Sequence, residues 1–188
     1  MRRLLSLLIV FILALAPTLA IADSYSDARR VFMNAGESSS YFRHSYGYAL
    51  FPTIGKVGLG VGGAHGSGRV YVRGKTVGTT SLTQLTLGLQ LGGQAYSQII
   101  FFRDKRAFDE FTGGNFEFGA QASAVAITAG ASAAANTAGG IQGGASGNKD
   151  NAETIGGYYK GMAVFTVAKG GLMYEASIGG QKFSYSPL

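Results

Sequence analysis

The segment from Gly47 to Arg73 constrains the fold of this chain most, because glycine recurs in it among β-branched and aromatic residues. Glycine weakens a strand unless the backbone must bend, bulge or approach another group closely. The pattern therefore predicts a strongly bent sheet, or a stretch of bare backbone that faces a ligand. His65 is the only residue of the segment of a type that commonly acts as a catalytic base. Since it has no catalytic partner there, we expect no catalytic site in the segment.

Around this segment the sequence predicts a series of short strands. Leu85, Leu87, Leu89 and Leu91 alternate with polar residues and glycine, which predicts a strand with one buried face. Glycine pairs at 170–171 and 179–180 suit two-residue hairpin turns and indicate an antiparallel meander at the end of the chain. The other expected strands are Tyr48–Phe51, Val57–Val61, Arg69–Arg73, Gln98–Phe102, Phe116–Ala124, Ala163–Ala168, Leu172–Ile178 and Lys182–Tyr185.

Helices are expected at three places. Asp23–Ala35 places Ala28, Val31, Phe32 and Ala35 at helical spacing, Ser38–His44 forms a second short turn, and Asp104 can cap a helix through Phe111. The fold class is therefore mainly β (α+β), a strongly curved antiparallel sheet or barrel-like domain with short N-terminal helices and one internal helix. The stretch Ala129–Asn151 has few large apolar side chains, so we expect a mobile loop there.

Residues 1–22 have the layout of a cleaved signal peptide. Arg2 and Arg3 precede a short apolar run, and Ala20-Ile21-Ala22 places small residues where signal peptidase cleaves. We therefore expect Asp23 to be the mature N-terminus, and an exported protein that is periplasmic or peripheral to the cell envelope. The chain has no cysteine, which excludes a lipid-anchored lipoprotein and any disulfide.

The charge of the chain bears on its partners. Without Arg2 and Arg3 the chain carries 14 basic and 10 acidic residues, and these are scattered along the sequence. Nucleic-acid binders have a denser basic cluster, so we expect no nucleic-acid partner. Anionic lipid head groups or acidic polysaccharides are the expected partners of a mildly basic exported chain.

The sequence contains no complete motif for cofactor binding, metal binding or nucleophilic catalysis. Gly58–Gly63 has the spacing of a dinucleotide fingerprint, but strand residues follow it where that site needs a helix. The two histidines, His44 and His65, do not have metal-ligand spacing, and no cysteine could act as a nucleophile. The sequence therefore predicts no enzyme, no catalytic residue, no metal site and no cofactor.

Several blocks, in order, resemble the SYLF lipid-binding family. They are Tyr48-Ala49-Leu50-Phe51-Pro52, Lys56–Gly63, Gly66–Gly68, Gly88–Gln94, Ile99–Phe102 with a Phe108/Phe111 helix, Phe118–Ser123 and Lys169–Gly180. The resemblance covers roughly residues 38–183, and it implies a helical segment at 23–37 followed by a lipid-binding domain at 38–188. Because eukaryotic relatives bind phosphoinositides and some bundle actin, it implies a non-enzymatic module for anionic phospholipid surfaces. Export makes actin an unlikely partner.

Two alternatives of other classes stay open from the sequence. One is a structural or adhesion module of the cell envelope without a lipid ligand. The other is a small outer-membrane β-barrel, although the expected strands are shorter than a bilayer crossing needs.

Basic residues near the glycine-rich segment are the candidate site for a lipid head group. We expect Lys56 in the turn before the glycines, Arg69 and Arg73 on one face of a strand, and Lys75 in the next turn. Arg29 and Arg30 on the N-terminal helix form a second candidate. Amides of bare glycine backbone could add donors to a phosphate.

Overall fold

The structure is a computed structural model that describes residues 24–119, 122, 124–127, 157–169 and 178–188. For residues 58–61 and 86–92 it describes the backbone alone. The predicted signal peptide, the predicted loop at 129–151 and almost all of the predicted strand at 172–178 lie outside the described residues.

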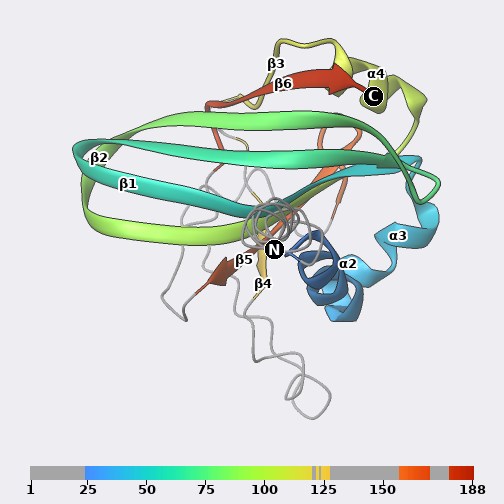
Figure 1. Ribbon diagram of the computed structural model, residues 1–188, viewed down its shortest axis with the longest axis horizontal. Helices are drawn as coiled ribbons and strands as arrows, with labels where there is room; N and C mark the ends of the chain where they lie inside the picture. The colour runs from blue at the N-terminus through green and yellow to red at the C-terminus, as the bar shows by residue number, and fades with distance from the viewer. Residues whose placement is uncertain (1–23, 120–121, 123, 128–156, 170–177) are drawn as a thin grey trace, which may run out of the picture.

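Two long strands dominate the fold. β1 (Gly47–Val72) and β2 (Lys75–Phe102) pair antiparallel along their whole length (Figure 1). Their turn is Arg73–Gly74, with φ of 50° and 78°, as the tightest hairpin turns require. The prediction of separate short strands in this region is wrong, because the glycines lie within two continuous strands, whose pairing is interrupted only at register shifts such as the one between Gly58 and Gly60.

The long hairpin doubles back on itself in its middle, at the left of Figure 1, which creates two layers. The first layer contains residues 47–57 of β1 and 93–102 of β2, and β5 (Met162–Lys169) pairs with β2 there. The second layer contains residues 62–72 of β1 and 75–85 of β2, and β6 (Gln181–Pro187) pairs with β2 on that side. The register shifts between Gly58 and Gly60, at the bend between the layers.

Short strands extend both layers. β3 (Phe116–Glu117) pairs with β6, and β4 (Val125–Ile127) pairs with β5 in parallel. The resulting sheet has the order β3-β6-β2-β5-β4, with β1 beside β2. The strand predicted at 116–124 is thus shorter than expected, and the pairing of β4 is a parallel exception in a largely antiparallel sheet.

The main core lies between the two layers, and glycines set how closely they approach. A Cβ on Gly68 would lie 2.7 Å from the ring of Phe51 and 2.9 Å from the carbonyl oxygen of Leu50. A Cβ on Gly66 would lie 2.6 Å from the side chain of Ile54. Gly66 and Gly68 face the first half of their own strand, so the prediction of a strongly bent sheet is confirmed, and these two glycines contact protein and not a ligand.

A second core lies on the outer face of the first layer. Residues 24–34 are helical, and α2 (Gly36–Ser39) and α3 (Tyr41–His44) follow. Phe32 of the first helix packs in one cluster with Phe101 and Phe165 of the sheet. The predicted helical segment is confirmed except at Val31, which is exposed.

Helix α4 (Lys105–Thr112) closes one end of the main core. Asp104 caps it by accepting a hydrogen bond from the backbone N–H of Ala107 at 2.9 Å. The ring of Phe111 lies 4.9 Å from that of Phe102 and 5.1 Å from that of Phe183, centroid to centroid. The predicted internal helix is confirmed, and so is the fold class of a strongly curved, mainly β domain with short helices.

Candidate functional site

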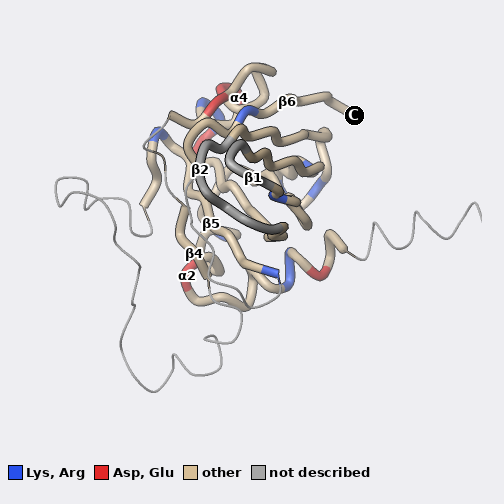
Figure 2. Tube along the Cα trace, turned by 90° about the vertical axis from the view of Figure 1, so that its left-hand side faces the viewer, with Lys and Arg blue, Asp and Glu red and all other residues tan. Residues whose placement is uncertain are grey.

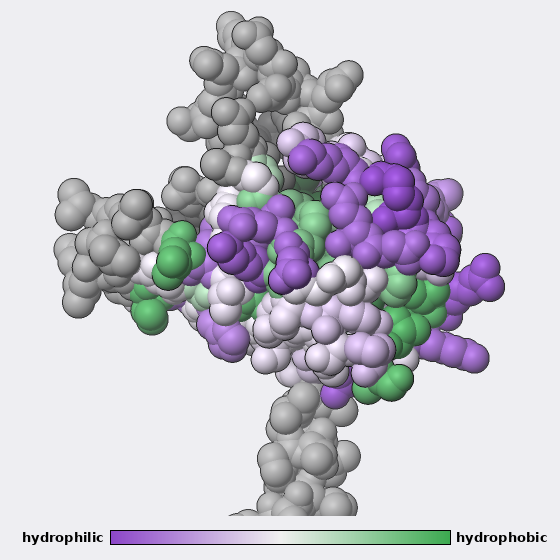
Figure 3. All heavy atoms as spheres, turned by 90° about the horizontal axis from the view of Figure 1, so that it is seen from above, coloured by the Kyte–Doolittle hydropathy of each residue, from purple (hydrophilic) through white to green (hydrophobic). Residues whose placement is uncertain are grey.

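Most of the outer face of the second layer is left open by the other described elements, and the N-terminal helix touches it only where Tyr25 contacts Ser67 and Arg69. We call it the open sheet face, and Figure 3 looks onto this side of the molecule, where a broad area has the pale colour of intermediate hydropathy. Alternation along the strands places its residues outward while their neighbours enter the core. They are His65, Ser67 and Arg69 of β1, Thr79, Ser81, Thr83 and Leu85 of β2, and Lys182, Ser184 and Ser186 of β6.

Hydroxyl groups make up most of this face. The register pairs Arg69 with Thr79 and Thr79 with Ser186, so their side chains form a row across three strands. The hydroxyls of Ser81 and Ser184 lie 2.6 Å apart. Because a hydroxyl can donate or accept, such rows suit contacts with phosphate, glycerol or sugar oxygens.

The hairpin that forms this face carries charge of one sign. From Gly47 to Phe102 the sequence contains no aspartate or glutamate, and its charged residues are Lys56, Arg69, Arg73 and Lys75. Arg73 and Lys75 are exposed at the hairpin turn and form no ion pair with any described residue. Their positive potential is therefore left for an external anion.

The α4 end of the molecule differs, because its charges are matched. Lys105 pairs with Asp109 at 2.7 Å, and Arg106 pairs with Glu110 at 3.1 Å. On the neighbouring strands Lys182 lies 3.5 Å from Glu117. Figure 2 shows basic and acidic segments close together near α4, whereas the long hairpin carries four basic residues and no acidic one.

Arg69 links the open sheet face to the N-terminal helix. Its guanidinium carbon lies 4.2 Å from the centroid of the Tyr25 ring, and the Tyr25 hydroxyl donates to the carbonyl oxygen of Ser67 at 3.3 Å. Burial raises the pKa of Tyr25, and the charge of Arg69 opposes that rise. Burial also raises the pKa of Tyr48, against the charge of Arg29. Both tyrosines therefore stay neutral beside the arginines.

The predicted head-group residues fall into two sets. Arg69, Arg73 and Lys75 lie in the second layer or at its turn, and the helix with Arg29 and Arg30 adjoins them through Tyr25. Arg29 is exposed, while Arg30 pairs with Asp27 at 3.3 Å. The two candidate groups of the sequence are thus neighbours.

Lys56 is the exception. It was expected in a turn, but it lies within β1, is 6% exposed and faces the interior. The interior contains other polar groups as well, since the side-chain amides of Gln98 and Gln181 exchange hydrogen bonds of 2.9 and 3.2 Å there. The fold therefore separates Lys56 from the exposed basic residues.

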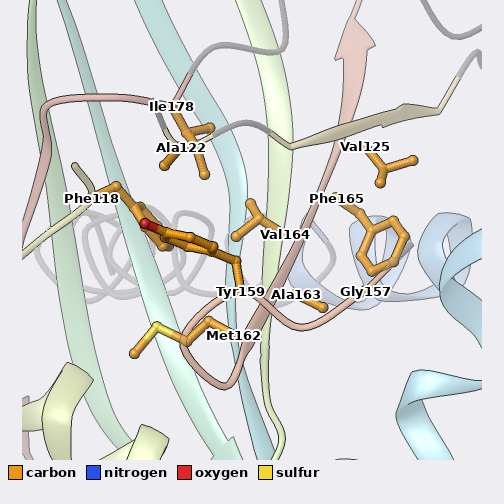
Figure 4. Close-up of a pocket in the computed structure, with 10 residues that line it drawn as sticks. All are labelled: Phe118, Ala122, Val125, Gly157, Tyr159, Met162, Ala163, Val164, Phe165 and Ile178. Carbon is orange, nitrogen blue, oxygen red and sulfur yellow. The ribbon is translucent and has the colours of Figure 1, made fainter. Parts of the chain in front are cut away.

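The hollows of the described structure offer little for chemistry. The pocket of Figure 4 has a volume of about 10 Å³, and its lining is apolar apart from the Tyr159 hydroxyl. A groove of about 420 Å³ beside β3 contains Glu110 and Glu117, both of which are exposed and ion-paired. Neither has the buried, convergent acids of a hydrolase.

Two more properties of the described residues bear on function. These residues contain no group of three or more histidine, aspartate or glutamate side chains that could hold a metal ion. Their helices are all too short or too polar to cross a bilayer.

The sequence identified the basic residues but missed the hydroxyl rows. Serine and threonine at 79–83 and 184–186 are period-two signals that sequence reasoning could have used. The sequence could not show that the N-terminal helices cover the outer face of the first layer and leave most of the outer face of the second layer open.

Comparison with known proteins bears on what such a face does. A family model described as "Ysc84: Las17-binding protein actin regulator" matches residues 83–186. Beta cell expansion factor A of Aeromonas veronii is 31% identical over 156 residues, which are 82% of this chain and 51% of that protein. The chain thus spans about half the length of this curated relative.

Proposed function

The chain belongs to the Ysc84 (SYLF) family, and on that premise we propose that it is an exported, non-enzymatic module that binds anionic phospholipid surfaces. The residues that match the family model, 83–186, begin at Thr83 in β2 and end in β6. We extend the lipid-binding domain to residues 38–188, with 23–37 as its helical segment, because β1 pairs with β2 along its whole length.

The observation that carries the proposal is the acid-free hairpin with its open, hydroxyl-rich face. Arg73 and Lys75 lie at its turn, Arg69 lies on the open sheet face, and Arg29 lies on the helix whose Tyr25 ring Arg69 contacts. Each basic side chain close to an anionic bilayer contributes roughly 1 kcal/mol, an attraction that salt screens. The adjacent hydroxyls would donate hydrogen bonds to phosphate or glycerol oxygens. Binding of this kind is reversible and confined to the surface.

The partner follows from where the chain acts. With residues 1–22 as a signal peptide, the protein is periplasmic or peripheral to the cell envelope, and the lipids it meets are those of the envelope. The description of the family names an actin regulator, but an exported chain does not meet cytosolic actin. We therefore propose an anionic phospholipid as the partner, and no nucleic acid.

Charge removal tests the proposal. The triple variant Arg69→Gln, Arg73→Gln, Lys75→Gln removes positive charge from the hairpin, and Arg103→Gln, Lys105→Gln, Arg106→Gln removes the same charge from the α4 end. We expect the hairpin variant to lose salt-sensitive co-sedimentation with phosphatidylglycerol vesicles by roughly tenfold or more, and the α4 variant to keep it. Circular dichroism checks that both variants fold.

Two results would contradict this assignment. Equal sedimentation of both variants would remove the hairpin from the site. If wild-type protein fails to sediment with any anionic vesicle, the proposal of lipid binding fails, and a structural module of the envelope becomes the better account.

A further inference from the structure

The bend of the long hairpin exposes apolar side chains on both layers. Val57, just before the bend in β1, is 67% exposed, and Leu85, just before it in β2, is 85% exposed. Leu85 was predicted to face the core. Instead Leu82 and Gln84 face the core, and Leu85 faces outward. In the sequence, leucine recurs at every second position after Leu85, at Leu87, Leu89 and Leu91. An exposed apolar residue that begins such a series is typical of an interaction surface.

Further from the bend than Val57 and Leu85, the outward-facing residues of each layer include a lysine. In the first layer, Val57 pairs with Gly93, and the row two residues behind joins Gly55, Ala95 and Lys169. The side chain of Lys169 is exposed there and donates to the Thr53 hydroxyl at 2.7 Å.

The second layer repeats this order. Leu85 pairs with Gly63, and the row two residues behind joins His65, Thr83 and Lys182. Two residues along a strand span about 7 Å. On each layer, therefore, an exposed apolar residue lies nearest the bend. A lysine lies in the row about 7 Å behind it, two strands away in the first layer and one strand away in the second.

We propose that the bend end enters the bilayer: Val57 and Leu85 reach the boundary of the acyl chains, while Lys169 and Lys182 contact the head groups. Apolar side chains that insert, together with basic side chains that meet the head groups, are typical of elements that lie in a membrane interface. Among the described residues, Lys169 and Lys182 supply the exposed positive charge nearest the bend, and Lys182 also lies 3.5 Å from Glu117. The inference rests on the proposed lipid binding and names the part of the molecule that inserts.

The chain contains no tryptophan, so a single tryptophan reports on one position. Leu85→Trp and Val57→Trp place the probe at the bend, and Tyr159→Trp places it at a 47% exposed position near the start of β5, at the other end of the sheet. With phosphatidylglycerol vesicles, we expect emission at the bend to shift to shorter wavelength. We also expect quenching when the acyl chains carry bromine, and neither change for Tyr159→Trp.

A second set of variants measures the contribution to binding. Val57→Ser with Leu85→Ser should weaken partition into these vesicles by about tenfold or more. Tyr159→Ser with Leu188→Ser, which removes two exposed apolar side chains away from the bend, should leave partition unchanged.

The outcomes separate this inference from the proposed function. Sedimentation with vesicles but no bromine quenching at either bend position overturns insertion and leaves surface binding intact. Absence of sedimentation overturns both proposals. A spectral shift without vesicles that grows with protein concentration assigns the bend to contact with a second copy of the chain, and it too overturns insertion.

Discussion

At the scale of single residues, two glycines of β1 act through the Cβ that they lack. Gly66 and Gly68 lie where the second half of the strand crosses the first, against Ile54 and Phe51. Gly55, in the same strand, has open space where a Cβ would be placed. Glycine is therefore required at some positions of the segment and not at others, a distinction that the sequence alone does not make.

A pair of alanine substitutions tests this distinction. Gly68→Ala should lower the free energy of unfolding by about 1–3 kcal/mol, because the new methyl group overlaps the Phe51 ring and the Leu50 carbonyl. Gly55→Ala should change it by less than about 0.5 kcal/mol. Urea denaturation measures both, and equal effects of the two substitutions would contradict the close crossing of the two halves of β1.

At the scale of elements, local signals predicted more than long-range ones. Helix α4 was predictable because its cap, Asp104, and its apolar positions, Ala107 and Phe111, lie within one short segment. The length of β1 was not, since a glycine that ends a strand and a glycine in a bent strand look alike in sequence. The parity of Leu85 was also missed, because alternation shows that two faces differ but not which of them meets the core.

The same limit applied to the candidate site. The basic residues were evident from the sequence. The burial of Lys56 was not, because a register shift earlier in β1 decides which face of the strand Lys56 lies on. The register between β1 and β2 shifts by one residue between Phe51 and Ile54, at Pro52, and Ser97 donates to the Pro52 carbonyl at 2.7 Å. Such a bulge moves the residues that follow it to the opposite face, up to the next register shift.

The cap of α4 gives a prediction in pH. The N–H of Ala107 and then the Arg103 side chain lower the pKa of Asp104. A lowered pKa means that the carboxylate stabilises the fold above its unfolded pKa of about 4, and that this stabilisation is lost as the pH falls through the lower folded value. Asp104→Asn should therefore lower the melting temperature at pH 7, and the difference from wild type should shrink toward pH 2.5.

Thermal unfolding followed by circular dichroism at both pH values checks this. Lys105→Gln is the matched control, since it removes a neighbouring exposed charge but not the cap. A difference between wild type and Asp104→Asn that is equal at pH 7 and pH 2.5 would show that the carboxylate charge does not support the helix.

At the scale of the whole molecule, covering elements and charge are both unevenly distributed. The N-terminal helices cover the first layer, and α4 with its matched ion pairs closes one end of the core. The second layer keeps an outward face of hydroxyls that is flanked by Arg69, Arg73 and Lys75. The central claim is that this face contacts the head groups of an anionic bilayer.

The chain has no cysteine, so one introduced thiol can carry an environment-sensitive dye that brightens in apolar surroundings. We would label Ser184→Cys on the open sheet face and Asn115→Cys, an exposed position beside β3, and add phosphatidylglycerol or phosphatidylcholine vesicles. The account predicts that the dye at 184 brightens with phosphatidylglycerol, that about 0.5 M salt suppresses the change, and that the dye at 115 stays constant. Brightening at 115 but not at 184, or equal brightening with both lipids, would contradict it.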